Sequence, residues 1–303
     1  MTKPLVSVLM TVYNRSLFIE ESIKSVIKSS YKNWELIIVD DQSSDGSVAI
    51  AKQYEAINPR IKVFINKQNL GDYPNRNRAA IYAKGKYLKY LDSDDLIYTH
   101  GLEVMVNAME KFPDAGFGFC AQKPEMTIPY PFIVSQNQAY KQEFLGNGFF
   151  KTGPSGTIIR RDAFEAVGGL SRTRYVGDYD SWLKLSQRYS VVVMHPGLIW
   201  WRMHDGQEYK KGQGFEKYLK ATTAVQLKYL FDEHCPLNAS ERKLAFKCLR
   251  QRHGRRTLSY LIPSLKFSRA FAYLKYSAAD LRHLFNGLSK SKIYYNLEEE
   301  LRT

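Results

Sequence analysis

The stretch WELIIVDDQSSDGSVAIAKQYEAI, residues 34–57, passes from a continuous apolar run through a polar turn into an apolar pattern with helical spacing. The run WELIIVDD is typical of a strand that is buried on both faces. The turn DQSSDGS supplies Ser, Asp and Gly, which favour the start of a helix, and VAIAKQYEAI is typical of an amphipathic helix. This stretch therefore predicts one strand followed by one helix of a layered fold.

The same alternation continues on both sides of this stretch. Residues 5–10 predict a buried strand, and a helix capped by Ser16 follows it. Farther along, RIKVFIN (60–66) predicts a strand, RNRAAIYAKG (76–85) a helix that ends at a glycine, and KYLKYLD (86–92) a further strand. This rhythm indicates an α/β fold, Rossmann-like and doubly wound, in which helices flank a mostly parallel sheet.

The second half of the chain is expected to continue this layer and then to become helical. Residues 123–150 have no clear period and predict a long irregular segment. Three stretches after residue 206, at 214–234, 240–256 and 269–285, suit amphipathic helices. We therefore expect an α/β domain over residues 1–206 and a basic, mostly helical region over residues 207–303.

Composition and charge narrow the class of protein. The 303 residues are 44% hydrophobic and 24% charged, which is ordinary for a soluble globular protein. The net charge is +14, and residues 207–303 alone hold 19 Lys and Arg against 9 Asp and Glu, which suggests an anionic partner there. Three distant cysteines argue against a zinc cluster or a disulfide framework. With no apparent signal peptide and no run of about 18 apolar residues, we expect the protein in the cytoplasm.

Polar residues follow three of the predicted strands: TVYN at 11–14, DD at 40–41 and DSDD at 92–95. Ligands of open parallel sheets bind beyond the carboxyl ends of the strands, so these three loops should meet at one edge. Crowded carboxylates repel one another unless they are solvated or hold a cation. Such a cluster suits Mn²⁺ or Mg²⁺, with a diphosphate as the natural shared ligand.

Four stretches follow one another in the chain: VSVLMTVYN (6–14), ELIIVDDQSSDGS (35–47), NLGDYPNRNRAAIYAKGKYLKYLDSDD (69–95) and GDYDSWLKL (177–185). Together they resemble the successive motifs of family 2 of the inverting glycosyltransferases. A DxD alone would be weak evidence, whereas this ordered set, which spans about residues 4–206, is specific. The resemblance implies the GT-A fold and a transfer of sugar from a nucleoside diphosphate sugar.

The resemblance also implies a nucleotide site. Thr11, Tyr13 and Asp41, together with Asp40, would hold the base and ribose. Arg76 stands where the family has the Arg of its ARN segment, and would face the donor.

A metal site and a base follow from the same resemblance. Asp92 and Asp94 form the DxD, with Asp94 as the direct metal ligand and Asp92 nearer the ribose or sugar, and Asp95 completes the acidic triplet. His204 in WRMH matches an Arg-x-His element that can contact the metal or the diphosphate. Asp178 falls at the Asp of the family's ED motif and would act as general base.

The chain departs from the family pattern at three positions. Gly177 stands where the family often has Glu, which leaves Asp180 as a competing candidate for the base. Asn75 and Ala79 replace the Ala and Gly of ARNxG, and these changes affect packing more than chemistry.

Several of these residues have simpler interpretations. Asp178 and Asp180 precede a predicted helix and could be its N-caps. Asp40 could only close a turn, and His204 could be a buried histidine. Trp201 and its neighbour Trp200 could pack on the sheet or stack on a sugar. The segment FKTGPSG (150–156) could line the acceptor side or form an ordinary turn.

The leading hypothesis is a metal-assisted, inverting glycosyltransferase of surface polysaccharide or glycolipid synthesis, with a UDP-sugar as donor and a glycan or lipid-linked acceptor. The alternatives are a non-catalytic nucleotide-binding relative and a nucleotidyltransferase, although TVYNRS (11–16) is not the Gly-rich loop that the latter would carry. For residues 207–303, contact with an anionic membrane on its inner face is favoured over nucleic acid, and the alternative is helical packing or a homo-oligomer contact. The sugar, acceptor, linkage and oligomeric state stay open.

Overall fold

The computed structural model describes residues 3–121, 128–205, 215–261, 266–278 and 295–302. The chain forms two compact units, each built from three segments. The first unit comprises residues 1–134, 152–172 and 188–203, and the second comprises residues 135–151, 173–187 and 204–303. The expected division at residue 206 stays a prediction.

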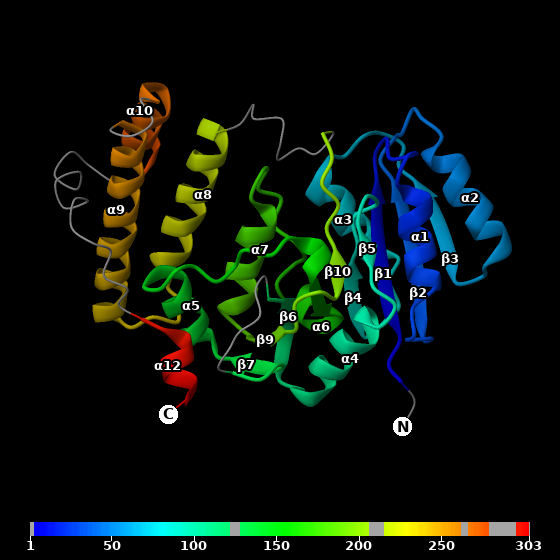
Figure 1. Ribbon diagram of the computed structural model, residues 1–303, viewed down its shortest axis with the longest axis horizontal. Helices are drawn as coiled ribbons and strands as arrows, with labels where there is room; N and C mark the ends of the chain where they lie inside the picture. Colours follow the sequence, from blue (N-terminus) through cyan, green and yellow to red (C-terminus); the bar gives the residue numbers. More distant parts are fainter. Residues whose placement is uncertain (1–2, 122–127, 206–214, 262–265, 279–294, 303) are drawn as a thin grey trace. The chain divides into compact units, whose positions relative to one another are not determined.

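The first unit contains a sheet of eight strands in the order β3-β2-β1-β4-β8-β6-β9-β7 (Figure 1). Strands β3, β2, β1 and β4 are parallel, β8 is antiparallel to both of its neighbours, and β6 is parallel to β9. This arrangement confirms the predicted mostly parallel α/β layer. The strands are β1 (Val6–Val12), β2 (Trp34–Asp40), β3 (Ile61–Ile65), β4 (Tyr87–Tyr90), β6 (Ala115–Cys120), β7 (Phe132–Val134), β8 (Thr157–Arg160) and β9 (Ser190–Met194).

Apolar runs form the central strands because both faces of each strand are covered. Val8, Leu9 and Met10 of β1 are completely buried, and so are Leu36 and Ile38 of β2. Each such side chain stabilises the fold by about 1.5–3 kcal/mol relative to an exposed one. The helices of this unit are α1 (Ile19–Ile27), α2 (Ser47–Ile57), α3 (Asp72–Ile81), α4 (Gly101–Lys111) and α6 (Arg161–Ala166).

The strand register brings the predicted polar loops to one edge of the sheet. Val12 at the end of β1 pairs with Asp40 at the end of β2, and the backbone N–H of Asp41 donates to the carbonyl of Val12 at 2.8 Å. On the other side of β1, Leu9 pairs with Tyr90 of β4. The loops that follow β1, β2 and β4 therefore begin beside one another, as the alternation of strands and helices predicts.

A second, two-stranded sheet lies just beyond the acidic turn. Strand β5 (Leu96–Ile97) pairs antiparallel with β10 (Ile199–Trp200). The chain approaches itself closely there: a Cβ on Gly101 would lie 2.3 Å from the carbonyl oxygen of Leu198. This pairing sets residues 199–203 against the end of the acidic turn, about a hundred positions away in the sequence.

The second unit is helical. Its elements are α5 (Gln136–Phe144), α7 (Gly177–Ser186), α8 (Phe215–Leu230), α9 (Ala239–Leu261), α10 (Phe267–Tyr276) and α12 (Leu297–Arg302). Helices α8, α9 and α10 pack side by side (Figure 1), which confirms the predicted helical C-terminal region. Part of the third predicted tail helix, at 279–285, lies outside the described residues.

The prediction of an irregular segment at residues 123–150 was wrong for residues 132–144, whereas residues 128–131 and 145–150 form no helix or strand. Strand β7 pairs with β9, and α5 follows directly. Helix α5 begins with a capping box: the hydroxyl of Ser135 accepts from the backbone of Gln138, and the Gln138 side chain accepts from the backbone of Ser135. The Ser-x-x-Gln spacing was the sequence signal for this helix.

Among the described residues, no helix combines the length and the apolar composition that a membrane span requires.

A buried histidine in α9 makes the stability of the protein sensitive to acid. His253 is 7% exposed, and its Nδ1 accepts the backbone N–H of Ala278 at 3.0 Å. Burial, together with the positive charges of Arg252 and Arg256, lowers the pKa of His253 from 6.5 to about 4. From α10, the ring of Tyr273 lies against the imidazole with a centroid distance of 6.0 Å. The folded state therefore holds this side chain neutral.

We expect the free energy of unfolding to fall as the pH drops from about 6.5 to about 4, because the unfolded chain takes up a proton at His253 before the folded chain does. The full effect of this one group is about 3 kcal/mol. Urea titrations across this pH range should show that the free energy of unfolding depends less steeply on pH in His253→Asn than in wild type. The asparagine amide oxygen can still accept the backbone N–H of Ala278. The same substitution at the exposed His234 provides the control. An equal pH dependence of the free energy of unfolding in wild type and His253→Asn would contradict the prediction.

Candidate functional site

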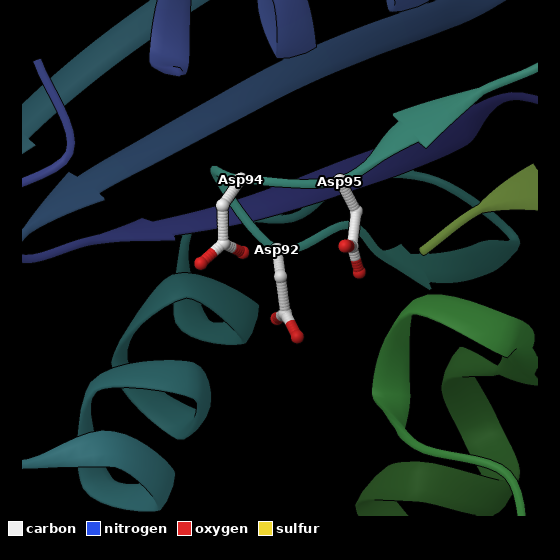
Figure 2. A group of neighbouring side chains, drawn as sticks. All are labelled: Asp92, Asp94 and Asp95. Atoms are coloured by element: carbon white, nitrogen blue, oxygen red, sulfur yellow. The ribbon is translucent and has the colours of Figure 1, made fainter. Parts of the chain in front are cut away.

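The acidic turn, residues 92–95, brings three carboxylates together. Oxygen atoms of Asp92, Asp94 and Asp95 lie within 4.8 Å of one another, and Figure 2 shows the three side chains projecting to the same side of the turn. The side chains of Asp92 and Asp94 are 28% and 13% exposed, and Asp95 is buried. A turn closed by the N–H of Asp95 and the carbonyl of Asp92, at 2.9 Å, holds them in this arrangement.

The negative charge of this turn is only partly compensated by its surroundings. Burial and the neighbouring Asp92 raise the pKa of Asp95 to about 7. Burial also raises the pKa of Asp92, against the opposing effect of Arg76. Oδ2 of Asp95 is buried and has no hydrogen-bond partner among the described residues. These features fit a hard divalent cation, because oxygen ligands and high local negative charge are what Mn²⁺ and Mg²⁺ require.

Arg76 reaches the turn from helix α3. Its Nη1 donates to Oδ1 of Asp92 at 2.7 Å and to the hydroxyl of Thr11 at 3.1 Å, and its Nε lies 3.0 Å from a carboxylate oxygen of Asp72. Arg76 is only 7% exposed. The contacts join the loop after β1 to the acidic turn, so the predicted residues Thr11, Arg76 and Asp92 do come together.

Arg15 reaches the same turn from the loop after β1. Its Nε donates to Oδ2 of Asp94 at 2.9 Å. Its Nη1 donates to the carbonyls of Tyr13 and Asn14, and its backbone N–H donates to the hydroxyl of Ser47 at 2.8 Å. Each of two guanidinium groups, Arg15 and Arg76, thus pairs with one member of the DxD.

The acidic turn is supported from behind by a buried lysine. Lys89 of β4 is completely buried, and its ammonium donates to the carbonyls of Tyr90 and Ser155. Burial lowers the pKa of Lys89 to about 8. The hydroxyl of Ser155 in turn accepts the backbone N–H of Asp92 at 2.9 Å. Lys89 therefore ties the short 3₁₀ helix Pro154–Gly156 to the acidic turn.

Arg202, which lies just after β10, supports the acidic turn with hydrogen bonds from its backbone and its side chain. Its backbone N–H donates to Oδ1 of Asp95 at 3.1 Å, and its Nε donates to the carbonyl of Asp94 at 2.8 Å. Its Nη2 pairs with Glu21 of α1. The pairing of β5 with β10 accounts for this contact between distant parts of the chain.

The two aspartates at the end of β2, Asp40 within the strand and Asp41 directly after it, have different surroundings. Both carboxylate oxygens of Asp41 accept protein donors at 2.8 Å: Oδ1 accepts from Asn66 and Leu70, and Oδ2 accepts from Gly71. Asp40 accepts from Ser43 through Oδ2, while its buried Oδ1 has no partner among the described residues. Asp41 thus holds the loop before α3, and Asp40 retains an acceptor oxygen without a partner.

The loops that should hold the nucleotide carry unusual backbone. Asn14 and Gln42 have φ angles of 52° and 68°, in the left-handed region that non-glycine residues rarely adopt. Such strain persists only where surrounding contacts hold it, and it is concentrated at functional loops. Beside Asn14, the side chain of Tyr13 is 52% exposed. An exposed aromatic ring on a held loop is suited to stack on a nucleotide base.

Asp178, Asp180 and His204 belong to the second unit, so their place relative to the acidic turn is not described. Val176 is the N-cap of α7, so the interpretation of Asp178 or Asp180 as N-cap was wrong. Oδ1 of Asp178 accepts the adjacent N–H of Tyr179 at 2.7 Å. The roles of these three residues stay predictions.

Asp180 is buried and surrounded by donors. It is 2% exposed, and it accepts from the hydroxyls of Thr173 and Tyr229 and from the ammonium of Lys228. The contacts with Lys228 and Tyr229 connect α7 to α8, so Asp180 stabilises the packing of these two helices.

Sequence reasoning missed Arg15 and Lys89; it included Arg202 only through the Arg-x-His element and Ser155 only within the segment 150–156, and it gave neither a contact with the acidic turn. Two signals were present. Arg15 directly follows the polar loop after the first strand, and Lys89 interrupts an otherwise apolar strand. Trp201, a predicted acceptor contact, is 51% exposed and therefore does not pack fully on the sheet.

Comparison with known proteins gives a consistent result. The family model described as "Glycosyl transferase family 2" matches residues 7–168. The protein EpsE of Bacillus subtilis (strain 168) is 34% identical over 197 residues, which are 60% of this chain and 66% of that protein. The chain thus spans just under two thirds of this relative. A further relative, from Escherichia coli, is 41% identical over 64% of this chain and 75% of its own length. Its name is UDP-Glc:alpha-D-GlcNAc-diphosphoundecaprenol beta-1,3-glucosyltransferase WfgD.

Solved structures share the fold. The S. aureus protein TarS (residues 1–349) in complex with UDP-GlcNAc superposes with a TM-score of 0.68 and 17% identity, over 90% of this chain and 81% of that one. The mannosyltransferase PcManGT from Pyrobaculum calidifontis, in complex with GDP-Man and Mn²⁺, has a TM-score of 0.59 and 14% identity, over 96% of this chain and 89% of that one. The predicted GT-A architecture is therefore confirmed.

Proposed function

Since this chain belongs to glycosyl transferase family 2, we propose that it transfers a sugar from a nucleoside diphosphate sugar to a hydroxyl group of a glycan or of a lipid-linked acceptor. The observation that carries this proposal is the cluster of three carboxylates within 4.8 Å at the carboxyl edge of the sheet, paired with two guanidinium groups. This edge is where open α/β sheets bind nucleotides. Uridine diphosphate is the expected leaving group.

The metal would be held chiefly by Asp94, with His204 as a further candidate, and Asp92 and Asp95 beside it. A bound Mn²⁺ or Mg²⁺ supplies positive charge that offsets the charge of the departing diphosphate. Asp95 can lie beside the metal because its Oδ1 accepts the backbone N–H of Arg202, while its Oδ2 has no partner among the described residues. The Mn²⁺ complex of the structural neighbour PcManGT is consistent with this assignment.

The donor would be held by the neighbouring loops. Thr11 and Tyr13 would contact the base and ribose, together with Asp40 and Asp41. The Asp40 oxygen without a partner among the described residues supports direct contact with the nucleotide, whereas the donors around Asp41 support a role in shaping the loop.

Two further residues would contact the substrates, one at the donor and one at the acceptor. Arg76, fixed by Asp72 and Asp92, would face the donor and keep Asp92 oriented toward the ribose or sugar. Trp201 is exposed enough to stack on a sugar of the acceptor.

The transfer would be a single displacement with inversion. The acceptor oxygen forms a bond to the anomeric carbon while the bond from that carbon to the diphosphate oxygen breaks. The nucleoside diphosphate leaves with the bonding electrons, and the proton of the hydroxyl passes to the carboxylate of Asp178. The surroundings of Asp180 favour Asp178 as the base, because Thr173, Tyr229 and Lys228 already donate to Asp180.

The acceptor class is inferred from a relative and from charge. The name of the E. coli relative specifies a sugar linked to diphosphoundecaprenol, which is a lipid carrier. Residues 207–303 hold 19 Lys and Arg against 9 Asp and Glu, a surplus that suits contact with an anionic membrane surface. Synthesis of a surface polysaccharide or glycolipid on the inner face of a membrane would use both features.

The proposal is tested by binding and by product formation. Calorimetry should show that uridine diphosphate binds with Mn²⁺ and binds much more weakly without it, with guanosine diphosphate as the comparison. UDP-sugars should then be screened for release of uridine diphosphate in the presence of lipid-linked acceptors. Binding without turnover of any donor would favour the non-catalytic alternative, and folded protein that binds neither nucleotide would contradict the proposal.

A further inference from the structure

The ion pair between Arg15 and Asp94 occupies the position expected for a metal. Nε of Arg15 lies 2.9 Å from Oδ2 of Asp94, and the two side chains are 28% and 13% exposed. A charge-assisted hydrogen bond at partly buried groups is stronger than an exposed ion pair. A cation that binds Oδ2 of Asp94 must therefore compete with this guanidinium.

Arg15 and Arg76 differ in how firmly they are held. Arg76 is 7% exposed, projects from a helix and engages the side chains of Asp72, Asp92 and Thr11. The Arg15 guanidinium also donates to two carbonyls of its own loop, those of Tyr13 and Asn14. Arg76 is thus a fixed part of the site, and the Arg15 guanidinium lies at its more exposed side.

The backbone of Arg15 is anchored even though its side chain is not enclosed. Its N–H donates to the hydroxyl of Ser47 at 2.8 Å, and that hydroxyl in turn donates to the carboxylate of Asp45. The preceding residue, Asn14, accepts the N–H of Ser44 at 2.8 Å. A rotation of the Arg15 side chain would therefore need no movement of the loop.

Charge determines which way the guanidinium would turn. A divalent cation at Asp94 carries twice the charge of Arg15 and repels it, and this repulsion is stronger in a partly buried site than in water. A diphosphate on the same cation would bring phosphate oxygens next to Arg15. The planar guanidinium matches phosphate oxygens in a two-pronged geometry.

We propose that Arg15 is a positioning residue that neutralises Asp94 before the donor binds, and that it transfers to the diphosphate of the donor when a divalent cation takes its place. Metal and nucleotide then strengthen each other's binding. The metal alone displaces Arg15 from Asp94 without offering it a new acceptor, and the nucleotide alone must draw Arg15 away from Asp94. The transfer of Arg15 to the diphosphate rests on the proposed function. The competition between Arg15 and the metal concerns only Arg15 and Asp94.

The first arm of the test measures Mn²⁺ alone. Electron paramagnetic resonance counts unbound Mn²⁺ during a titration of the whole chain without nucleotide. Arg15→Gln removes the competing charge, so we expect Mn²⁺ to bind about tenfold more tightly than to wild type. Arg78→Gln is the matched control, because it removes the same charge from an exposed position of α3. Unchanged or weaker Mn²⁺ binding by folded Arg15→Gln would overturn the inference.

The second arm measures uridine diphosphate at saturating Mn²⁺. Here Arg15→Gln should weaken binding about tenfold, opposite in direction to the first arm. Arg15→Lys keeps a charge but lacks the two-pronged geometry, so it should restore competition with Mn²⁺ and recover nucleotide binding only in part. A residue with a merely structural role would shift both affinities in the same direction, and that result would also overturn the inference.

The two arms separate this inference from the proposed function. If wild type bound no nucleoside diphosphate, the proposed function would fail, and the Mn²⁺ titration would still decide whether Arg15 competes at Asp94. Thermal unfolding of each variant establishes that it is folded. If Arg15→Gln did not fold, Arg15→Met, which also removes the charge and keeps an unbranched side chain, would carry both measurements.

Discussion

Replacing Asp94 with Asn should weaken the binding of uridine diphosphate in the presence of Mn²⁺ at least about 100-fold, because even residues that only support metal ligands cost 10- to 100-fold when they are changed. Asparagine keeps the size of the side chain and one oxygen but removes the charge. The loss should be largest with Mn²⁺ present, since binding without metal is already weak. Calorimetry with and without Mn²⁺ measures both.

Asp114→Asn is the matched control for this experiment, because Asp114 is exposed and lies in the same compact unit. It should bind Mn²⁺ and nucleotide as wild type does. Wild-type affinity in a folded Asp94→Asn variant would show that the acidic turn does not hold the metal–diphosphate. The cluster would then be a structural turn stabilised by Arg15 and Arg76.

Replacing Asp178 with Asn should lower the rate of sugar transfer about 10²- to 10⁴-fold, the contribution typical of a positioned general base. The affinity for uridine diphosphate with Mn²⁺ should stay within about twofold, because Asp178 acts on the acceptor and not on the nucleotide. Release of uridine diphosphate from the best donor measures the rate, and calorimetry measures the affinity.

Asp180→Asn provides the contrast. This carboxylate is buried and accepts from Thr173, Tyr229 and Lys228, so its change should lower the free energy of unfolding by about 1–3 kcal/mol. Transfer by the folded fraction should fall much less than for Asp178→Asn. If Asp180→Asn lost the reaction and Asp178→Asn retained it, the assignment of the base would be reversed.

Much of the fold could be predicted because burial on both faces leaves a strong signal. The runs that became β1 and β2 are continuously apolar, and their alternation with amphipathic helices specifies parallel pairing. The direction of β8 could not be predicted in the same way. Its residues Thr157–Arg160 suit either orientation, and only the neighbouring strands decide it.

The candidate site was partly predictable for a related reason. The carboxylates of Asp92, Asp94 and Asp95 are adjacent in sequence and follow a strand, so topology alone places them at the ligand edge. The groups that pair with them come from elsewhere. Arg202 meets the turn only because β10 pairs with β5, and a two-residue strand leaves almost no sequence pattern.

The difference between Asp40 and Asp41 was also beyond sequence. They are adjacent at the end of the same strand, and only the donors from Asn66, Leu70 and Gly71 around Asp41 distinguish their roles. Hydrogen bonds between loops depend on geometry that no local pattern encodes. Residue type can nominate such side chains but cannot rank them.

The interleaving of the two compact units has a consequence for anyone who shortens this chain. The polypeptide leaves the first unit at residue 134, returns at 152, leaves again at 172 and returns at 188 before its last departure after 203. A chain cut after residue 206 would keep α5 and α7 but lose α9 and α8, against which they pack. The side chains of Tyr140, Phe144 and Trp182 are now at most 1% exposed. They would become more exposed to solvent, and the shortened protein would be prone to self-association. A chain that ends at residue 206 is therefore expected to have a destabilised second unit.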